Sequence, residues 1–214
     1  MRPTSERITI PGPAGALQAI VEDVGGEANA LAVVCHPHPL YGGTMDNKVV
    51  VSVARALQEQ GVNTLRFNFR GVGTSAGVHD EGQGETQDAL AAADWARERW
   101  PRLPLISAGF SFGSFVALRL ALARPARQLI LVAPAVSRLD FATLDDPQCP
   151  WLVVQGEDDE VVPTAEVVSW AKNRSRLPKL VLVPGAGHFF HGKLIELKGI
   201  VADEIRSGGR RSGA

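Results

Sequence analysis

The chain has 214 residues, with 22 basic and 23 acidic side chains and a formal net charge of −1. Hydrophobic residues make up 45% and charged residues 21%, which excludes a disordered chain, because disorder needs few apolar residues and a high net charge. A nearly neutral chain lacks the excess positive charge that would attract the phosphate backbone of a nucleic acid, so the composition argues against a nucleic-acid partner. The length fits one domain of ordinary size and leaves little room for accessory domains.

The sequence carries no pattern of a secreted or membrane protein. Residues 1–7 are polar, no apolar signal region follows them, and the longest apolar runs have the length of strands. Cys35 and Cys149 lie far apart, each beside an apolar strand-like run, so we expect two small buried side chains rather than a disulfide. These features predict a cytoplasmic protein without a membrane span.

Strand and helix patterns alternate along the chain after an N-terminal hairpin, whose strands are expected at 7–10 and 17–24. Strand-like runs at 31–35, 62–67, 105–108, 128–132, 151–155 and 179–183 alternate with helical patterns at 44–60, 85–99, 112–123, 164–173 and 193–205. This order favours right-handed crossovers and a mostly parallel, doubly wound α/β sheet with antiparallel strands at one edge. We predict a single domain over residues 1–206 and a flexible tail over 207–214.

A candidate nucleophile lies where the strand at 105–108 ends. In an open α/β sheet, ligands bind beyond the carboxyl ends of the strands. The segment Gly109-Phe110-Ser111-Phe112-Gly113 follows this strand and leads into a helix, and a sharp turn of this kind needs small residues two positions before and after the Ser. The alternative is a tight turn with a capping Ser. We interpret Ser111 as a nucleophile.

A serine nucleophile needs a base within hydrogen-bond reach. His188 follows the strand at 179–183 through a loop of Pro, Gly and Ala, a position from which it can reach Ser111. We prefer it to His191, which we expect at the start of the last helix, and to His79, which we expect in a solvated loop.

The acid that orients this base is expected after the strand at 151–155. Four consecutive carboxylates, Glu157 to Glu160, follow Gly156 there, and they could be no more than a solvated turn. We select Asp159, which precedes an apolar Val-Val-Pro segment, and keep Asp158 as the alternative.

Together these segments resemble the α/β-hydrolase family, which has the same chain order of nucleophile, acid and base. The chain resembles in particular small bacterial serine hydrolases without a lid, which carry an HPHP segment followed by GGTMDNKVV, here 36–50, and an NFRGVGTS segment, here 68–75. The resemblance implies the α/β-hydrolase fold and esterase-type chemistry, with no cofactor. The segment 133–150, where lids of this fold insert, is long enough for a short helix around Phe141 but not for a cap domain.

Two backbone N–H groups are expected to stabilise the oxyanion. One belongs to Phe112, which follows the nucleophile at a helix N-terminus. The other comes from the loop after the strand at 31–35, which in relatives reads His-Gly-X with X donating. Here it reads His36-Pro37-His38, and because Pro has no N–H, the donor should be His38.

The remaining candidate sites are weaker. The pair of His36 and His38 lacks the third ligand that a zinc site needs, so we expect no metal. The glycines around 71–77 lack the spacing of a nucleotide-binding loop. Arg70 could face an acidic substrate, but the resemblance favours a structural role.

These observations predict a serine hydrolase that cleaves carboxylic ester or thioester bonds through an acyl-enzyme. The alternatives are an acyltransferase, a peptidase or a perhydrolase using the same residues, or a non-catalytic binding protein that kept the fold. The partner is a small-molecule acyl ester of modest length, and the protein is a monomer or a homodimer. Apolar side chains are expected to line the substrate site: Leu40, Tyr41, Phe110, Val161 and Phe189.

Overall fold

The computed structural model describes residues 4–211. Eight strands form one sheet in the order β1-β2-β4-β3-β5-β6-β7-β8. The strands are β1 (Thr4–Gly12), β2 (Gly15–Asp23), β3 (Ala30–Cys35), β4 (Val62–Phe67), β5 (Leu105–Phe110), β6 (Ala126–Val132), β7 (Trp151–Gly156) and β8 (Lys179–Val183). Strand β2 pairs antiparallel with β1 and β4. All the other pairs are parallel, along the order β4-β3-β5-β6-β7-β8. The predicted fold class is therefore confirmed.

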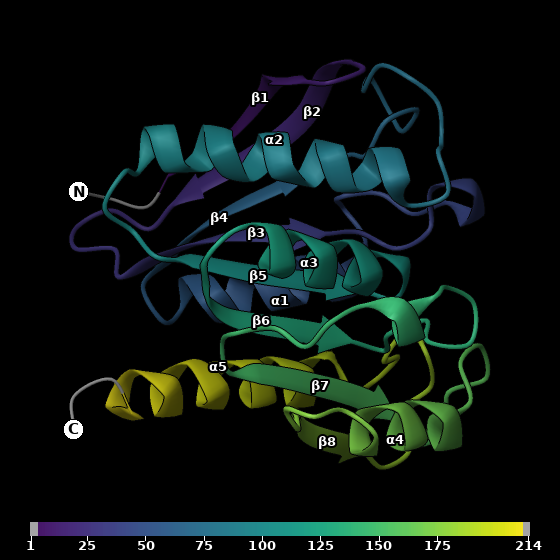
Figure 1. The fold of residues 1–214 in the computed structure, drawn as a ribbon. Coiled ribbons are helices and arrows are strands. Elements are labelled where there is room, and N and C mark those ends of the chain that lie inside the picture. Colours follow the sequence, from purple (N-terminus) through teal and green to yellow (C-terminus); the bar gives the residue numbers. More distant parts are fainter. Residues whose placement is uncertain (1–3, 212–214) are drawn as a thin grey trace.

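Helices cover both faces of the sheet (Figure 1). Helices α1 (Lys48–Gln58) and α5 (Leu194–Arg211) pack on one face and share a core cluster with the inner strands. Helices α2 (Gln83–Arg99), α3 (Phe112–Ala123) and α4 (Thr164–Lys172) pack on the other. Strands β3, β4, β5 and β7 are buried along their whole length, as strands in a sheet covered on both faces should be.

The sequence also explains where helices begin and how closely they pack. Helix α1 was expected over 44–60 but begins at Lys48, because the Asn47 side chain caps it by accepting a hydrogen bond from the Val49 N–H at 2.9 Å.

Helix α2 presents a stripe of small, fully buried side chains to the sheet, which lets the helix and the sheet come close together. They are Ala89, Ala92, Ala93 and Ala96.

The C-terminal helix is longer than the sequence predicted. Helix α5 continues to Arg211, beyond the expected end at 205, so it takes up much of the segment 207–214 that was expected as a tail. Residues 212–214 lie outside the described part of the chain.

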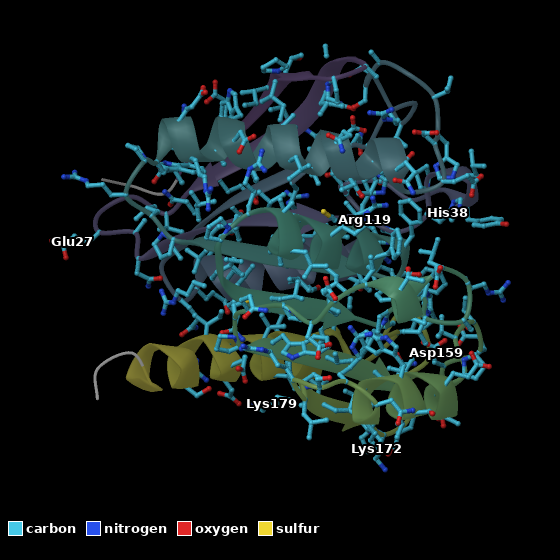
Figure 2. The ribbon with its side chains drawn as sticks, viewed as in Figure 1. Glu27, His38, Arg119, Asp159, Lys172 and Lys179 are labelled. Carbon is cyan, nitrogen blue, oxygen red and sulfur yellow. The ribbon has the colours of Figure 1, made fainter. Side chains whose placement is uncertain are left out.

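The connection between β6 and β7, where a lid would insert, is short. Its regular structure is one 3-10 turn, η2 (Phe141–Thr143), close to the expected helix around Phe141. The carboxyl ends of the parallel strands are thus left without a lid, and Figure 2 shows His38 and Asp159 at this end of the molecule, with Glu27 at the opposite one.

No helix within residues 4–211 is long and apolar enough to cross a membrane.

Candidate active site

Ser111 lies on a strained turn between β5 and α3. Its backbone has a φ of 55° and a ψ of −118°, a conformation that non-glycine residues rarely adopt. The turn has no space for larger neighbours, because a Cβ on Gly109 would lie 2.0 Å from the Gly113 carbonyl oxygen. A Cβ on Gly113 would lie 2.4 Å from the Cys35 carbonyl oxygen, at the end of β3. These contacts explain the two glycines of the motif.

A hydrogen-bonded chain links three side chains from three separate loops. Ser111 Oγ lies 3.0 Å from His188 Nε2, and His188 Nδ1 lies 2.9 Å from Asp159 Oδ2. The carboxylate can only accept, so Nδ1 carries the proton and Nε2 is free to accept from the serine hydroxyl. The imidazole is 3% exposed and the carboxylate is fully buried. A base in this tautomer is oriented to remove the proton of Ser111.

The turn after β7 holds Asp159 as a carboxylate. Its Oδ1 accepts hydrogen bonds from the backbone N–H groups of Val161, at 2.9 Å, and Val162, at 2.7 Å. Burial alone would raise the pKa of Asp159, but the hydrogen bonds from His188 and from these two N–H groups outweigh it, so its pKa lies below the usual value. Asp158, the alternative acid, is exposed.

Two further residues form hydrogen bonds to the hydrogen-bonded chain of side chains, and neither was expected from the sequence. Gln155, at the end of β7, donates from Nε2 to Asp159 Oδ2 at 2.9 Å. Glu160 accepts a hydrogen bond from the His188 backbone N–H through Oε2 at 3.1 Å. Gln155 belongs to an apolar strand run and Glu160 to a run of acids, so neither pattern indicated a contact with the site.

The backbone N–H groups of His38 and Phe112 have no hydrogen-bond acceptor in the part of the chain that the structure describes. Phe112 is the first residue of α3, where backbone N–H groups lack an intrahelical acceptor. The carbonyl of Pro37 belongs to the same peptide unit as the His38 N–H, and it lies 2.6 Å from His36 Nδ1. Since N–H and C=O point in opposite directions in a trans peptide, this contact also orients the N–H.

His36 is a buried, neutral side chain. Its Nε2 accepts a hydrogen bond from the Phe69 N–H at 3.0 Å, so Nδ1 donates to Pro37. Burial lowers the pKa of His36 to about 3. Both ring nitrogens are engaged inside the protein, which removes His36 as a metal ligand. No group of three metal-ligating side chains is present in the described part of the chain.

A cavity of about 640 Å³ opens beside Ser111. Tyr41, Val161 and Phe189 line it, as expected, together with Ala135 and Leu139. Two charged side chains, Glu81 and Arg138, also line it, so the cavity is less uniformly apolar than the sequence suggested.

Two of the expected substrate contacts do not line this cavity. Leu40 is 68% exposed and does not line the cavity, because the 3-10 turn η1 (Pro39–Tyr41) directs it to solvent. Phe110 is 1% exposed and belongs to the core, where its ring lies 5.1 Å from that of His188. It therefore packs behind the histidine rather than beside a substrate.

Arg70 and His79 lie in the loop between β4 and α2, and both are more enclosed than a solvated loop would leave them. Arg70 forms a two-pronged ion pair with the buried Asp88, at 2.8 Å and 3.0 Å, which supports the structural interpretation. The His79 side chain was expected to be solvated but is 7% exposed, because it packs beside the buried Glu85.

Comparisons with known proteins show the family of the chain. Residues 26–144 match the family described as serine aminopeptidase, S33. An α/β serine hydrolase homologue from Coxiella burnetii is 44% identical with a TM-score of 0.90, and the match covers 93% of this chain and 96% of that one. A serine hydrolase without a lid from Xanthomonas campestris is also 44% identical, with a TM-score of 0.89 and coverage of 97% and 94%.

Curated relatives extend the comparison to sequence. An uncharacterized protein of Rickettsia prowazekii is 34% identical over 209 residues, which cover 93% of this chain and 88% of that protein. A lysophosphatidylserine lipase of Danio rerio is 29% identical over 171 residues, covering 60% of this chain and 44% of the lipase. The chain belongs to the S33 serine aminopeptidase family and is thus a serine hydrolase of the α/β-hydrolase superfamily.

Proposed function

We propose that the protein hydrolyses carboxylic esters or thioesters through a Ser111-His188-Asp159 triad. The observation that carries the proposal is the unbroken chain from Ser111 Oγ through His188 to Asp159, at 3.0 Å and 2.9 Å, on the wall of an open cavity. Nucleophile, base and orienting acid are the parts that acyl transfer to a serine needs.

The reaction follows from these positions. Ser111 Oγ attacks the acyl carbonyl while His188 Nε2 takes its proton, and Asp159 stabilises the imidazolium that forms. The N–H groups of His38 and Phe112 stabilise the oxyanion, each contributing about 2.7–4 kcal/mol. His188 then protonates the leaving alcohol or thiol, which leaves an acyl-enzyme. Water, deprotonated by His188, releases the acid and restores Ser111.

The cavity favours a small substrate with an apolar acyl group. Tyr41, Val161 and Phe189 offer apolar surface, and the volume of about 640 Å³ is in the range of small-molecule sites. The lipases among the curated relatives support cleavage of an ester rather than of a peptide. The segment 133–150 forms no cap domain, which leaves the site accessible from solvent.

Substitution of Ser111 tests the proposal. Wild-type protein should hydrolyse short p-nitrophenyl esters and react with a fluorophosphonate probe at a ratio of about one label per chain, because the probe needs an activated serine. Ser111→Ala should lose both activities with its melting temperature preserved. Ser137→Ala, which changes an exposed serine in the β6–β7 loop, is the matched control and should behave as wild type. Esterase activity retained in Ser111→Ala would show that the nucleophile is wrongly assigned.

A substrate panel separates the alternative activities. Esters of increasing chain length, acyl-CoA thioesters and peptides should be compared, with and without an acceptor alcohol or hydrogen peroxide. The proposal expects the highest kcat/KM on short esters or thioesters. A preference for peptides, or for transfer to the acceptor over water, would replace it with a peptidase, acyltransferase or perhydrolase. A protein that binds acyl compounds but does not label with fluorophosphonate would be a binding protein.

A further inference from the structure

His79 lies against both residues that supply the proposed oxyanion donors. Its ring centroid is 4.7 Å from that of His38 and 5.6 Å from that of Phe112. The rings of His38 and Phe112 are themselves 4.9 Å apart, so the three rings form one contiguous cluster. His79 does not line the cavity, and it forms no hydrogen bond with Ser111, His188 or Asp159.

Hydrogen bonds within its own turn hold the backbone and the ring of His38. Its carbonyl accepts hydrogen bonds from the N–H groups of Tyr41 and Gly43, each at 3.1 Å, and its ring Nδ1 accepts from the Leu40 N–H at 3.2 Å. This turn is exposed, with Tyr41 87% accessible. Outside its own turn, the His38 ring contacts the rings of Phe112 and His79.

A buried carboxylate holds His79 in place. Glu85, in the first turn of α2, is fully buried, and His79 Nδ1 lies 2.9 Å from its Oε1, a close polar contact without the alignment of a hydrogen bond. The same carboxylate accepts hydrogen bonds from the backbone N–H groups of Asp80, at 2.9 Å, and Gly82, at 2.8 Å. Glu85 therefore anchors both the ring and the backbone of the loop that carries it.

We propose that His79, held by Glu85, is a positioning residue that fixes the relative placement of the His38 and Phe112 N–H groups. The inference rests on the proposed function, because it assigns these groups to the oxyanion. Donors of this kind act only when they lie about 2.7–3.1 Å from the developing charge, and an error of about 1 Å can cost about a hundredfold in rate. The buried His79 ring contacts the rings of both donor residues and therefore opposes a displacement of either one.

The test compares His79→Ala with His79→Phe on a short p-nitrophenyl ester. The alanine variant removes the ring contacts with His38 and Phe112. It should lower kcat about tenfold or more, with KM within about twofold of wild type, because these contacts hold the donors that act in the transition state. The phenylalanine variant restores a ring of similar size and should recover most of kcat. Glu85→Gln, which keeps the shape of the anchor but removes its charge, should also lower kcat more than it changes KM.

An inhibitor and a stability control separate positioning from a loss of folding. A phenylboronic acid forms a tetrahedral adduct with the serine, and its inhibition constant should rise in His79→Ala by about the same factor as kcat falls. Trp100→Ala, at the far end of α2, should lower the melting temperature while leaving kcat and the inhibition constant unchanged.

The outcomes of the two proposals are distinguishable. Wild-type kcat and wild-type boronate inhibition in a folded His79→Ala protein would overturn the inference and leave the esterase proposal intact. A loss of melting temperature in His79→Ala, with kcat preserved at temperatures where it is folded, would do the same. Wild-type protein without Ser111-dependent hydrolysis would instead overturn both.

Discussion

Among single residues, Asp159 offers the sharpest test of the proposed chemistry. Asp159→Asn keeps the shape of the side chain, but its amide can donate to His188 Nδ1 and favour the tautomer with the proton on Nε2, which cannot accept from Ser111. We expect kcat to fall by about 10⁴, as for the corresponding change in serine proteases. The measurement is steady-state hydrolysis of a short ester.

Asp158→Asn is the matched control for this change. Asp158 is the neighbouring, exposed carboxylate, and its replacement should leave kcat within about twofold of wild type, as expected for an exposed side chain outside the hydrogen-bonded chain of Ser111, His188 and Asp159. If Asp158→Asn lost activity and Asp159→Asn kept it, the acid would be assigned to the wrong residue.

Residue-scale prediction from the sequence is possible where chemistry and chain position point to the same residues. Ser111, His188 and Asp159 each follow a strand, so the sheet brings them to one edge, and the structure places them within hydrogen-bond distance. Gln155 and Glu160 could not be found in this way, because their contacts depend on how the turns after β7 and β8 fold against each other.

At the scale of elements, the close packing of α3 against the end of β3 leads to a paired prediction. Gly113→Ala would place a Cβ 2.4 Å from the Cys35 carbonyl oxygen and 2.5 Å from that of His36, and backbone atoms there cannot move without shifting the loop of His38. We expect a loss of about 1–3 kcal/mol in unfolding free energy together with a fall in kcat. Urea unfolding and ester hydrolysis measure the two effects.

Gly199→Ala should have the opposite effect on stability. Gly199 lies in α5 and is exposed, and a Cβ added there would meet no neighbouring atom within 4 Å. Alanine at this position should stabilise the protein by about 0.5–1 kcal/mol through helix propensity, with activity unchanged. If both substitutions changed stability in the same direction, close packing would not be the cause of the first.

The elements also show where sequence patterns stop being informative. The alternation of runs identifies the strands, but β5 is buried on both faces, so its pattern cannot tell which face Phe110 occupies. The expected strand also ended at 108, which left Phe110 in the turn beside Ser111, whereas β5 continues to Phe110 and buries it. The extension of α5 to Arg211 was missed because the Ser-Gly-Gly segment after 206 is a poor helix former by propensity.

Across the whole molecule, buried or paired carboxylates join segments that are distant in the chain. Asp94 on α2 pairs with Arg124 after α3, and this contact holds the pKa of Asp94 below its usual value. Asp146, before β7, pairs with Arg174, after α4. Burial alone would raise the pKa of Asp146, but the Arg176 N–H and the Arg174 guanidinium outweigh it and lower the pKa.

These pKa shifts predict how stability depends on pH. A carboxylate whose pKa is lower in the folded than in the unfolded state stabilises the fold fully above the unfolded value of 3.8. That contribution disappears as the pH falls through 3.8 toward the folded value. These carboxylates should therefore keep their contribution to the free energy of unfolding near neutral pH and lose it below about pH 4. The buried His36, whose pKa is lowered from 6.5 to about 3, adds a loss of stability that begins below about pH 6.5. Urea titrations from about pH 7 to about pH 2.5 measure both effects.

Asp146→Asn isolates one of these contributions. The Asp146 side chain is 11% exposed, so its pairing with Arg174 is not fully screened by solvent, and the variant should be less stable than wild type at neutral pH. The difference should shrink as the pH falls, because protonation removes the same charge from the wild type. Asp145→Asn, at the exposed neighbouring carboxylate, should stay within about 0.5 kcal/mol of wild type at neutral pH. A stability gap between Asp146→Asn and wild type that stayed constant into acid would mean that lost packing, rather than the carboxylate charge, accounts for it.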